Sequence, residues 1–174
     1  MKISTRQLAL DAMLAAMCAV LGYLAVDTGP IKVTFESLPI LLGALMFGPI
    51  DGLLIGAIGT GIYQLLRYGV SATTLLWMLP YAICGLLIGW YAKKKCFNLN
   101  LKQTVIAVAL NELLITLLNT GVIYLDSKIY GYWFPGYISA SLVIRFVISI
   151  VKAIVFAVVL YNLIPQIKKV IRKN

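Results

Sequence analysis

The sequence predicts an all-α, polytopic membrane protein: a bundle of six transmembrane helices. Of its 174 residues, 61% are hydrophobic and only 12% are charged, whereas a soluble domain is about half apolar and a quarter charged. Apolar runs of about 20 residues, long enough to cross a bilayer, follow one another along the chain, and most Lys and Arg lie beside them. We therefore expect a single membrane domain over residues 1–174.

Four apolar runs each fit one spanning helix, but the stretch from Ser37 to Leu66 is too long for one. A single helix there would measure about 45 Å against a hydrocarbon core of about 30 Å. Gly48-Pro49 interrupts the stretch, and such a pair punctuates helices, which leaves one long kinked helix or two helices. The six-helix interpretation has helices at 5–26, 37–47, 49–66, 70–92, 103–125 and 138–167.

The basic residues decide between these two interpretations. Ten of the 15 Lys and Arg fall in three groups: Lys2 and Arg6; Lys93, Lys94, Lys95 and Lys102; Lys168, Lys169, Arg172 and Lys173. Cytoplasmic loops carry an excess of such residues, and only an even number of helices puts all three groups on one side. We therefore expect six helices with both termini cytoplasmic. Because the cations flank apolar runs, the formal charge of +9 indicates a lipid surface and no nucleic-acid partner.

Two of the expected outward loops carry apolar or aromatic side chains. Residues 27–36 alternate apolar and polar side chains up to Phe35, which indicates a short extended segment. Residues 126–137 are rich in aromatic rings, among them Trp133. An aromatic belt at the membrane interface explains this composition, and a lid of rings that closes over a flat ligand is the alternative.

Charged side chains inside a bilayer are costly, so each is a candidate for function. If helix five ends and helix six begins at the outer surface, Asn119 and Arg145 lie at one depth, and Glu112 and Lys152 lie at a deeper one. The seven-residue spacing within each helix keeps each pair on one face. Glu112 and Lys152 then either neutralise each other and hold the bundle together, or they contact a ligand.

Arg145 has no acidic residue at its own level on helix five. Near the outer mouth, its planar guanidinium is suited to clamp a carboxylate, and snorkelling or helix capping is the alternative. Tyr63, Gln64 and Arg67 are expected to line the same mouth. The chain has no His and no Cys pair with ligand spacing, so no metal site, cofactor or catalytic centre is expected.

The first helix is rich in alanine, with Ala12 and Ala16, and Ala15 and Ala19, four residues apart. Small residues at this spacing let two helices approach closely in lipid. The alanines serve either packing within the bundle or docking of another membrane subunit.

Several of these motifs together resemble a known family. LPILLGALMFGPIDGLLIGAIG from Leu38, NTGVIYL from Asn119 and the helix of Arg145 look similar to the substrate-binding (S) component of energy-coupling factor (ECF) transporters. The resemblance implies a binding subunit for a water-soluble vitamin in a prokaryotic plasma membrane. It also implies two kinds of partner, a transmembrane coupling (T) subunit docked on the alanines of helix one, and two ATPase subunits that power transport. The protein itself would not be an enzyme.

The motifs are most similar to the folate-type subgroup but depart from it at three places. GTGIYQLL from Gly59 lacks an acidic residue expected in helix three, VSATTLLW from Val70 replaces a Pro-Gly-Phe segment, and Lys152 is farther from Arg145 than the pattern expects. Folate or pantothenate is favoured, with riboflavin or another vitamin open, because two cations at the site favour an anionic ligand.

Three other functions remain open from the residues alone. An intramembrane enzyme has little support, since no HExxH, aspartate pair or serine dyad occurs. An autonomous ion-coupled carrier would use Glu112 as its coupling carboxylate, although no internal repeat is evident. The last is an assembly subunit that binds no ligand.

Overall fold

The computed structural model of the chain describes the backbone of residues 5–27, 32–132 and 136–173. In chain order its elements are α1 (Thr5–Tyr23), β1 (Val26–Asp27), β2 (Lys32–Val33), α2 (Ser37–Met46), α3 (Pro49–Tyr68), α4 (Thr74–Lys94), α5 (Leu101–Ile129) and α6 (Gly136–Lys173). Five of these helices are long and apolar enough to cross a membrane. The predicted all-helical membrane bundle is confirmed.

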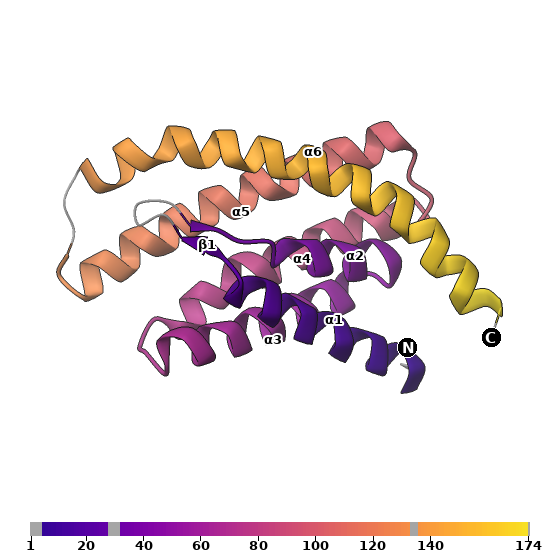
Figure 1. Cartoon of the computed structure of the whole chain (residues 1–174), viewed down its shortest axis with the longest axis horizontal. Helices are drawn as coiled ribbons and strands as arrows, with labels where there is room; N and C mark the ends of the chain where they lie inside the picture. Colours follow the sequence, from indigo (N-terminus) through magenta and orange to yellow (C-terminus); the bar gives the residue numbers. More distant parts are fainter. Residues whose placement is uncertain (1–4, 28–31, 133–135, 174) are drawn as a thin grey trace.

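The helices form a layered bundle with α2 at its centre. Helices α5 and α6 pack together on one side, α1 and α3 pack together on the other, and α4 joins the two sides through contacts with α3 and α5 (Figure 1). Helix α2 contacts α1, α3, α4 and α6, and eight of its ten residues are buried. At about 15 Å, α2 is too short to span a membrane alone.

The break between α2 and α3 lies where the sequence predicted it. Gly48 has a φ of 125° and caps α3, and Pro49 occupies the first turn of the helix. A left-handed φ favours glycine, while proline tolerates the first turn because its missing N–H would have no intrahelical partner there. Two residues thus convert one long apolar stretch into two helices.

Helices α3 and α4 approach closely through glycines. A Cβ on Gly52 would lie 2.5 Å from the carbonyl oxygen of Gly85, and a Cβ on Gly56 would lie 2.6 Å from that of Tyr81. Contacts this short exclude any side chain, so backbone packs on backbone as in other membrane helix pairs rich in small residues. This packing fixes the position of Tyr81, which faces the cavity described below.

The loop between α1 and α2 contains the short extended segment that the sequence suggested. Val26 pairs with Val33 and Asp27 with Lys32 in an antiparallel register. Phe35 lies beyond the strands and packs its ring 6.3 Å from that of Phe156 on α6. The hairpin therefore leads the chain across the bundle to the start of α2.

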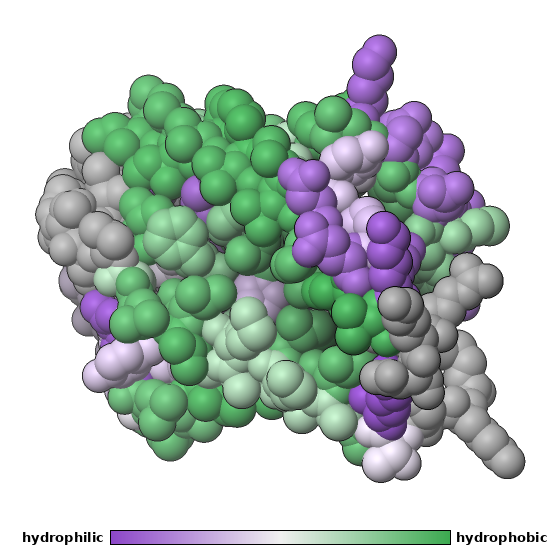
Figure 2. All heavy atoms as spheres, turned by 45° about the vertical axis from the view of Figure 1, so that its right-hand side comes forward, coloured by the Kyte–Doolittle hydropathy of each residue, from purple (hydrophilic) through white to green (hydrophobic). Residues whose placement is uncertain are grey.

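Within the part of the chain that the structure describes, the basic groups gather at one end of the bundle. Figure 1 shows both chain ends and the connection between α4 and α5 at this end, and Lys168 Nζ donates to the carbonyl of Phe97 at 2.7 Å, which ties α6 to that connection. Hydrophilic side chains cluster there beside a broad hydrophobic surface (Figure 2). We call this end of the molecule the basic end.

Candidate functional site

A cavity of about 530 Å³ opens inside the bundle. Its walls come from the hairpin and the start of α2, the last turns of α3, the first half of α4, the second half of α5 and residues 145–152 of α6. These parts of α3 to α6 lie toward the end opposite the basic end (Figure 1). The volume is within the range of small-molecule sites, about 300–1,000 Å³.

The deepest charged group in the cavity is an ion pair between α5 and α6. Lys152 Nζ lies 2.9 Å from Glu112 Oε2, and the side chains are 14% and 1% exposed. Both residues line the cavity, and Lys152 Nζ also lies 5.4 Å from the centre of the Phe156 ring. The structure thus contains the ion pair that the sequence offered as one of two alternatives; whether the pair also contacts a ligand stays a prediction.

Arg145 and Asn119 both line the cavity as well. Asn119 Nδ2 donates to the hydroxyl of Tyr81 at 3.3 Å, and this bond joins α5 to α4. Arg145 stands seven residues before Lys152, so one face of α6 presents both cations to the cavity. The cavity wall on α6 is therefore positively charged.

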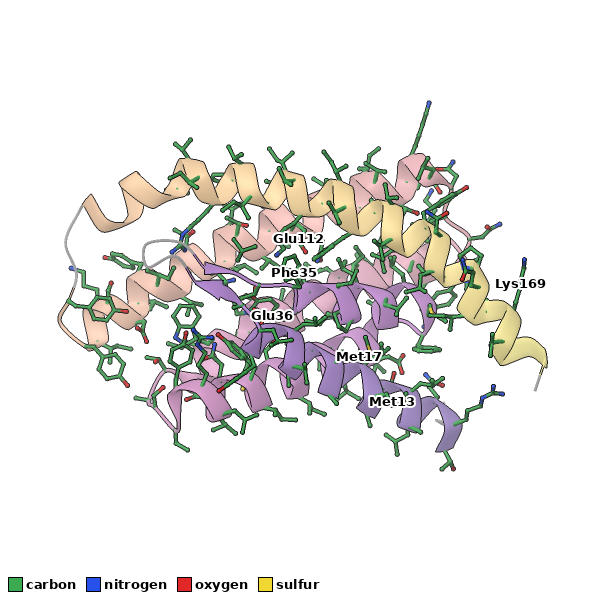
Figure 3. The ribbon with its side chains drawn as sticks, in the orientation of Figure 1. Met13, Met17, Phe35, Glu36, Glu112 and Lys169 are labelled. Carbon is green, nitrogen blue, oxygen red and sulfur yellow. The ribbon has the colours of Figure 1, made fainter. Side chains whose placement is uncertain are left out.

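A second carboxylate lies where the sequence analysis did not place one. Glu36, just before α2, is 2% exposed, accepts a hydrogen bond from Thr34 Oγ1 at 3.0 Å and is within hydrogen-bonding reach of the Tyr81 hydroxyl. Figure 3 shows Glu36 and Glu112 in the interior, between α1 on one side and α6 on the other. The sequence signal for Glu36 was an acidic residue directly before an apolar helix. Such a residue is equally typical of an exposed loop, so the sequence did not indicate a buried carboxylate.

Asp126 forms two hydrogen bonds at the end of the cavity that lies away from the basic end. Trp77 Nε1 of α4 donates to Asp126 Oδ1 at 3.4 Å, and the Tyr132 hydroxyl donates to Asp126 Oδ2. The sequence analysis placed residue 126 in a loop, whereas α5 extends to Ile129, so the carboxylate projects from a helix. Tyr130 and Tyr132 line the cavity; whether the aromatic segment acts as a lid or as an interfacial belt stays a prediction.

The comparison with protein families identifies the fold. The family model described as "ECF transporter, substrate-specific component" matches residues 6–164, nearly the whole chain. The chain belongs to this family. The family is one of transporter components, and the predicted resemblance is confirmed.

Two solved structures share the fold of this S component. One, described as the S component of a bacterial ECF transporter, matches with a TM-score of 0.64 and 19% identity over 95% of this chain and 97% of that chain. The other, FolT bound with folic acid, matches with a TM-score of 0.60 and 22% identity over 86% and 90%. No curated protein gives a sequence match. At such identities the likeness shows the fold.

The other predicted site residues of the S component lie at different distances from the cavity. Tyr63 and Gln64 line it. Arg67 and Phe35 are not among the described residues that form the walls of the cavity. Arg67 Nη1 donates to the carbonyl of Tyr23 at 3.3 Å and so ties α3 to the end of α1. Trp133 lies outside the described residues.

The four alanines of α1 divide between two faces. Ala15 and Ala19 are buried, and Ala15 lies where α1 crosses α3, because a Cβ on Gly59 would meet the Ala15 carbonyl oxygen at 2.8 Å. Ala12 and Ala16 are exposed, beside Met13 and Met17, whose exposures are 63% and 49% (Figure 3). The alanine-rich helix therefore serves internal packing on one face and leaves the other open.

The described residues contain no group of three His, Cys, Asp or Glu side chains that could hold a metal ion. The cavity offers groups suited to recognition of a ligand: two cations on α6, one carboxylate just before α2, two carboxylates on α5, and hydroxyl and indole groups between them. Such a set can hold a small molecule that carries both an anionic group and hydrogen-bond donors.

Proposed function

We propose that this S component is the high-affinity binding subunit for uptake of a water-soluble vitamin, with folate or pantothenate favoured. The observation that carries the proposal is the cavity itself: polar and charged walls enclose about 530 Å³ within a membrane bundle. Polar groups are expensive at such a depth, and a bound polar ligand accounts for their presence. Family membership supports the same function.

The two cations on the α6 wall of the cavity support a ligand that carries an anionic group. Arg145 and Lys152 face the cavity from α6, and a guanidinium recognises a carboxylate through two parallel hydrogen bonds. Folate and pantothenate both carry a carboxylate. On another wall Glu36 lies near the Tyr81 hydroxyl, and a carboxylate accepts paired N–H donors such as those of a pterin ring. This second feature favours folate over pantothenate, whereas the departures from the folate-type motifs weigh against folate.

The distribution of charge supports an outward-facing site. If the basic end is cytoplasmic, as the excess of Lys and Arg in cytoplasmic loops indicates, both termini are cytoplasmic and the cavity opens outward in a prokaryotic plasma membrane. The chain would then capture the vitamin, and a T subunit with two ATPases would power its release inward.

Native mass spectrometry of the protein purified alone in detergent tests the proposed function. We expect one vitamin molecule per chain, either retained through purification or taken up when folate and pantothenate are titrated in. Riboflavin, which carries no carboxylate, serves as a neutral comparison. A chain that stays empty with all three compounds would contradict the vitamin-binding function and favour a carrier or an assembly subunit.

The exposed face of α1 is the proposed contact with the T subunit. Ala16→Trp places a large ring on a surface where helices would pack closely, and overpacking of this kind costs about 1–3 kcal/mol. We expect the affinity for the T subunit to fall about 5- to 150-fold, because about 1.4 kcal/mol corresponds to a factor of ten, and less T subunit to co-purify. The affinity for vitamin should be unchanged.

Leu117→Trp is the matched control for this variant, because Leu117 is 53% exposed on α5, away from α1. It should leave co-purification intact. Undiminished assembly of Ala16→Trp would rule out this face of α1, and equal losses in both variants would point to a general effect of the added ring.

A further inference from the structure

A second hollow, of about 220 Å³, lies between α4 and α5 on the apolar outer surface. Leu87 on α4 and Ile106 and Leu110 on α5 form its rims and are 42%, 58% and 62% exposed. Asn111 lies at its floor but is 5% exposed, so the surface offered is almost entirely hydrocarbon. We call this hollow the α4–α5 groove. It shares no lining residue with the cavity of the candidate functional site.

Each wall of the groove runs into a lysine at the basic end. On α4 Leu87 and Tyr91 are four residues apart, and Lys95, four residues further, caps the end of the helix. On α5 the residues four apart are Leu114, Leu110, Ile106 and then Lys102. Residues four apart lie above one another on a helix. Lys95 and Lys102 are both exposed, so one lysine stands at the end of each wall of the apolar groove.

The neighbouring aromatic residue marks the level of the membrane interface. Trp90 is 53% exposed, and the ammonium of Lys94 lies 3.7 Å from the centre of its ring. Trp at the end of a spanning helix sits at the headgroup level. The lysines at the end of the groove are thus at headgroup level, and the groove itself is within the hydrocarbon of the same leaflet.

We propose that the α4–α5 groove binds one anionic phospholipid, with the phosphate between Lys95 and Lys102 and one acyl chain along the groove. The dimensions agree: twelve residues separate Lys102 from Leu114, about 18 Å of helix, and one leaflet contributes about 15 Å of hydrocarbon. Charge complementarity favours a lipid over a partner helix, because basic pockets between membrane helices at this level suit anionic headgroups.

The experiment is native mass spectrometry of the full chain in detergent with equimolar phosphatidylglycerol and phosphatidylcholine. We expect phosphatidylglycerol to be retained at about one molecule per chain, at least about tenfold over phosphatidylcholine, since two lysines act on its charge. Equal retention of the two lipids would overturn the proposal.

Two pairs of variants separate the groove from the general surface. Lys95→Gln/Lys102→Gln should abolish the preference, whereas Lys93→Gln/Lys169→Gln removes the same charge at the same end and should preserve it. Leu110→Trp should fill the groove and reduce retention, whereas Leu117→Trp, two turns along α5 and outside the groove, should not.

Each contrary result has a specific meaning. If both lysine pairs reduce retention equally, the basic end attracts lipid diffusely and the groove is no site. If the wild-type chain appears as a dimer that Leu110→Trp dissociates while lipid retention is unchanged, a second copy of the chain occupies the groove. Far-UV circular dichroism of every variant shows whether the fold is intact.

Discussion

Removing either partner of the Glu112–Lys152 ion pair is expected to lower the free energy of unfolding by about 3–5 kcal/mol. The pair is almost fully enclosed, with exposures of 1% and 14%, so the remaining partner loses its counter-charge where little water can solvate it. Glu112→Leu and Lys152→Met each remove one charge and keep most of the side-chain volume. Denaturation of the purified protein in detergent, followed by far-UV circular dichroism, measures the loss.

An exposed lysine provides the control for this loss. Lys169 is exposed at the basic end, so Lys169→Met should change stability by no more than about 0.5 kcal/mol. If Glu112→Leu or Lys152→Met behaved like Lys169→Met, the ion pair would contribute nothing to the bundle.

The double variant Glu112→Leu/Lys152→Met separates a structural role from a ligand contact. Replacing both partners of a buried ion pair by apolar residues is often neutral or stabilising, so stability should return close to that of the wild type. We expect vitamin affinity to remain reduced, because both side chains line the cavity. A double variant that binds normally would show that the pair only holds α5 and α6 together.

The level of this ion pair followed from the sequence by counting residues. Two antiparallel helices share one depth scale once their outer ends are set, and the rise of about 1.5 Å per residue then placed Glu112 beside Lys152. The Gly48-Pro49 break was predictable for a similar reason, because both residues act on their own backbone. The depth of a residue along its helix and the backbone preference of a residue can both be predicted without knowing which helices pack beside it.

Rotation of a helix about its axis was much harder to predict. Ala15 and Ala16 are adjacent in sequence, yet one is buried against α3 and the other is exposed, since successive residues point about 100° apart. In a membrane helix both faces are apolar, so hydrophobic periodicity does not tell them apart. Arg67 illustrates the same difficulty: its depth suited the cavity, but it bonds to the carbonyl of Tyr23.

The position of the Glu36 carboxylate inside the bundle could be found only from the tertiary fold. The hairpin carries the residue from a connecting loop into the interior, where it meets the hydroxyl of Tyr81 from α4. Asp126 likewise gained its role from contacts with Trp77 and Tyr132. Each carboxylate meets its partners only when segments far apart in sequence pack together. Neither residue spacing nor composition predicts that packing.

Arg145→Ala is expected to weaken the binding of folate or pantothenate by about 10–100-fold, because hydrogen bonds to charged groups contribute about 1.5–3 kcal/mol. Arg145 faces the cavity from α6 at a shallower level than Lys152, where an incoming carboxylate would meet it first. Trp77 lines the same cavity, so a titration followed by tryptophan fluorescence measures the affinity. Lys128→Ala is the control, since it removes an exposed cation near the same end.

Two further comparisons tie the loss to recognition of the carboxylate. Arg145→Lys keeps the charge but lacks the planar fork, so its affinity should fall between those of the wild type and Arg145→Ala. A methyl ester of the vitamin should bind the wild type more weakly than the free acid does, and Arg145→Ala should no longer distinguish ester from acid. A change in protein stability would affect the binding of acid and ester alike. The comparison of acid with ester in wild type and Arg145→Ala is therefore a double-mutant-type cycle that isolates the contact between Arg145 and the carboxylate. If Arg145→Ala discriminated between acid and ester as strongly as the wild type, the carboxylate would bind elsewhere, and Lys152 would be the cation to test next.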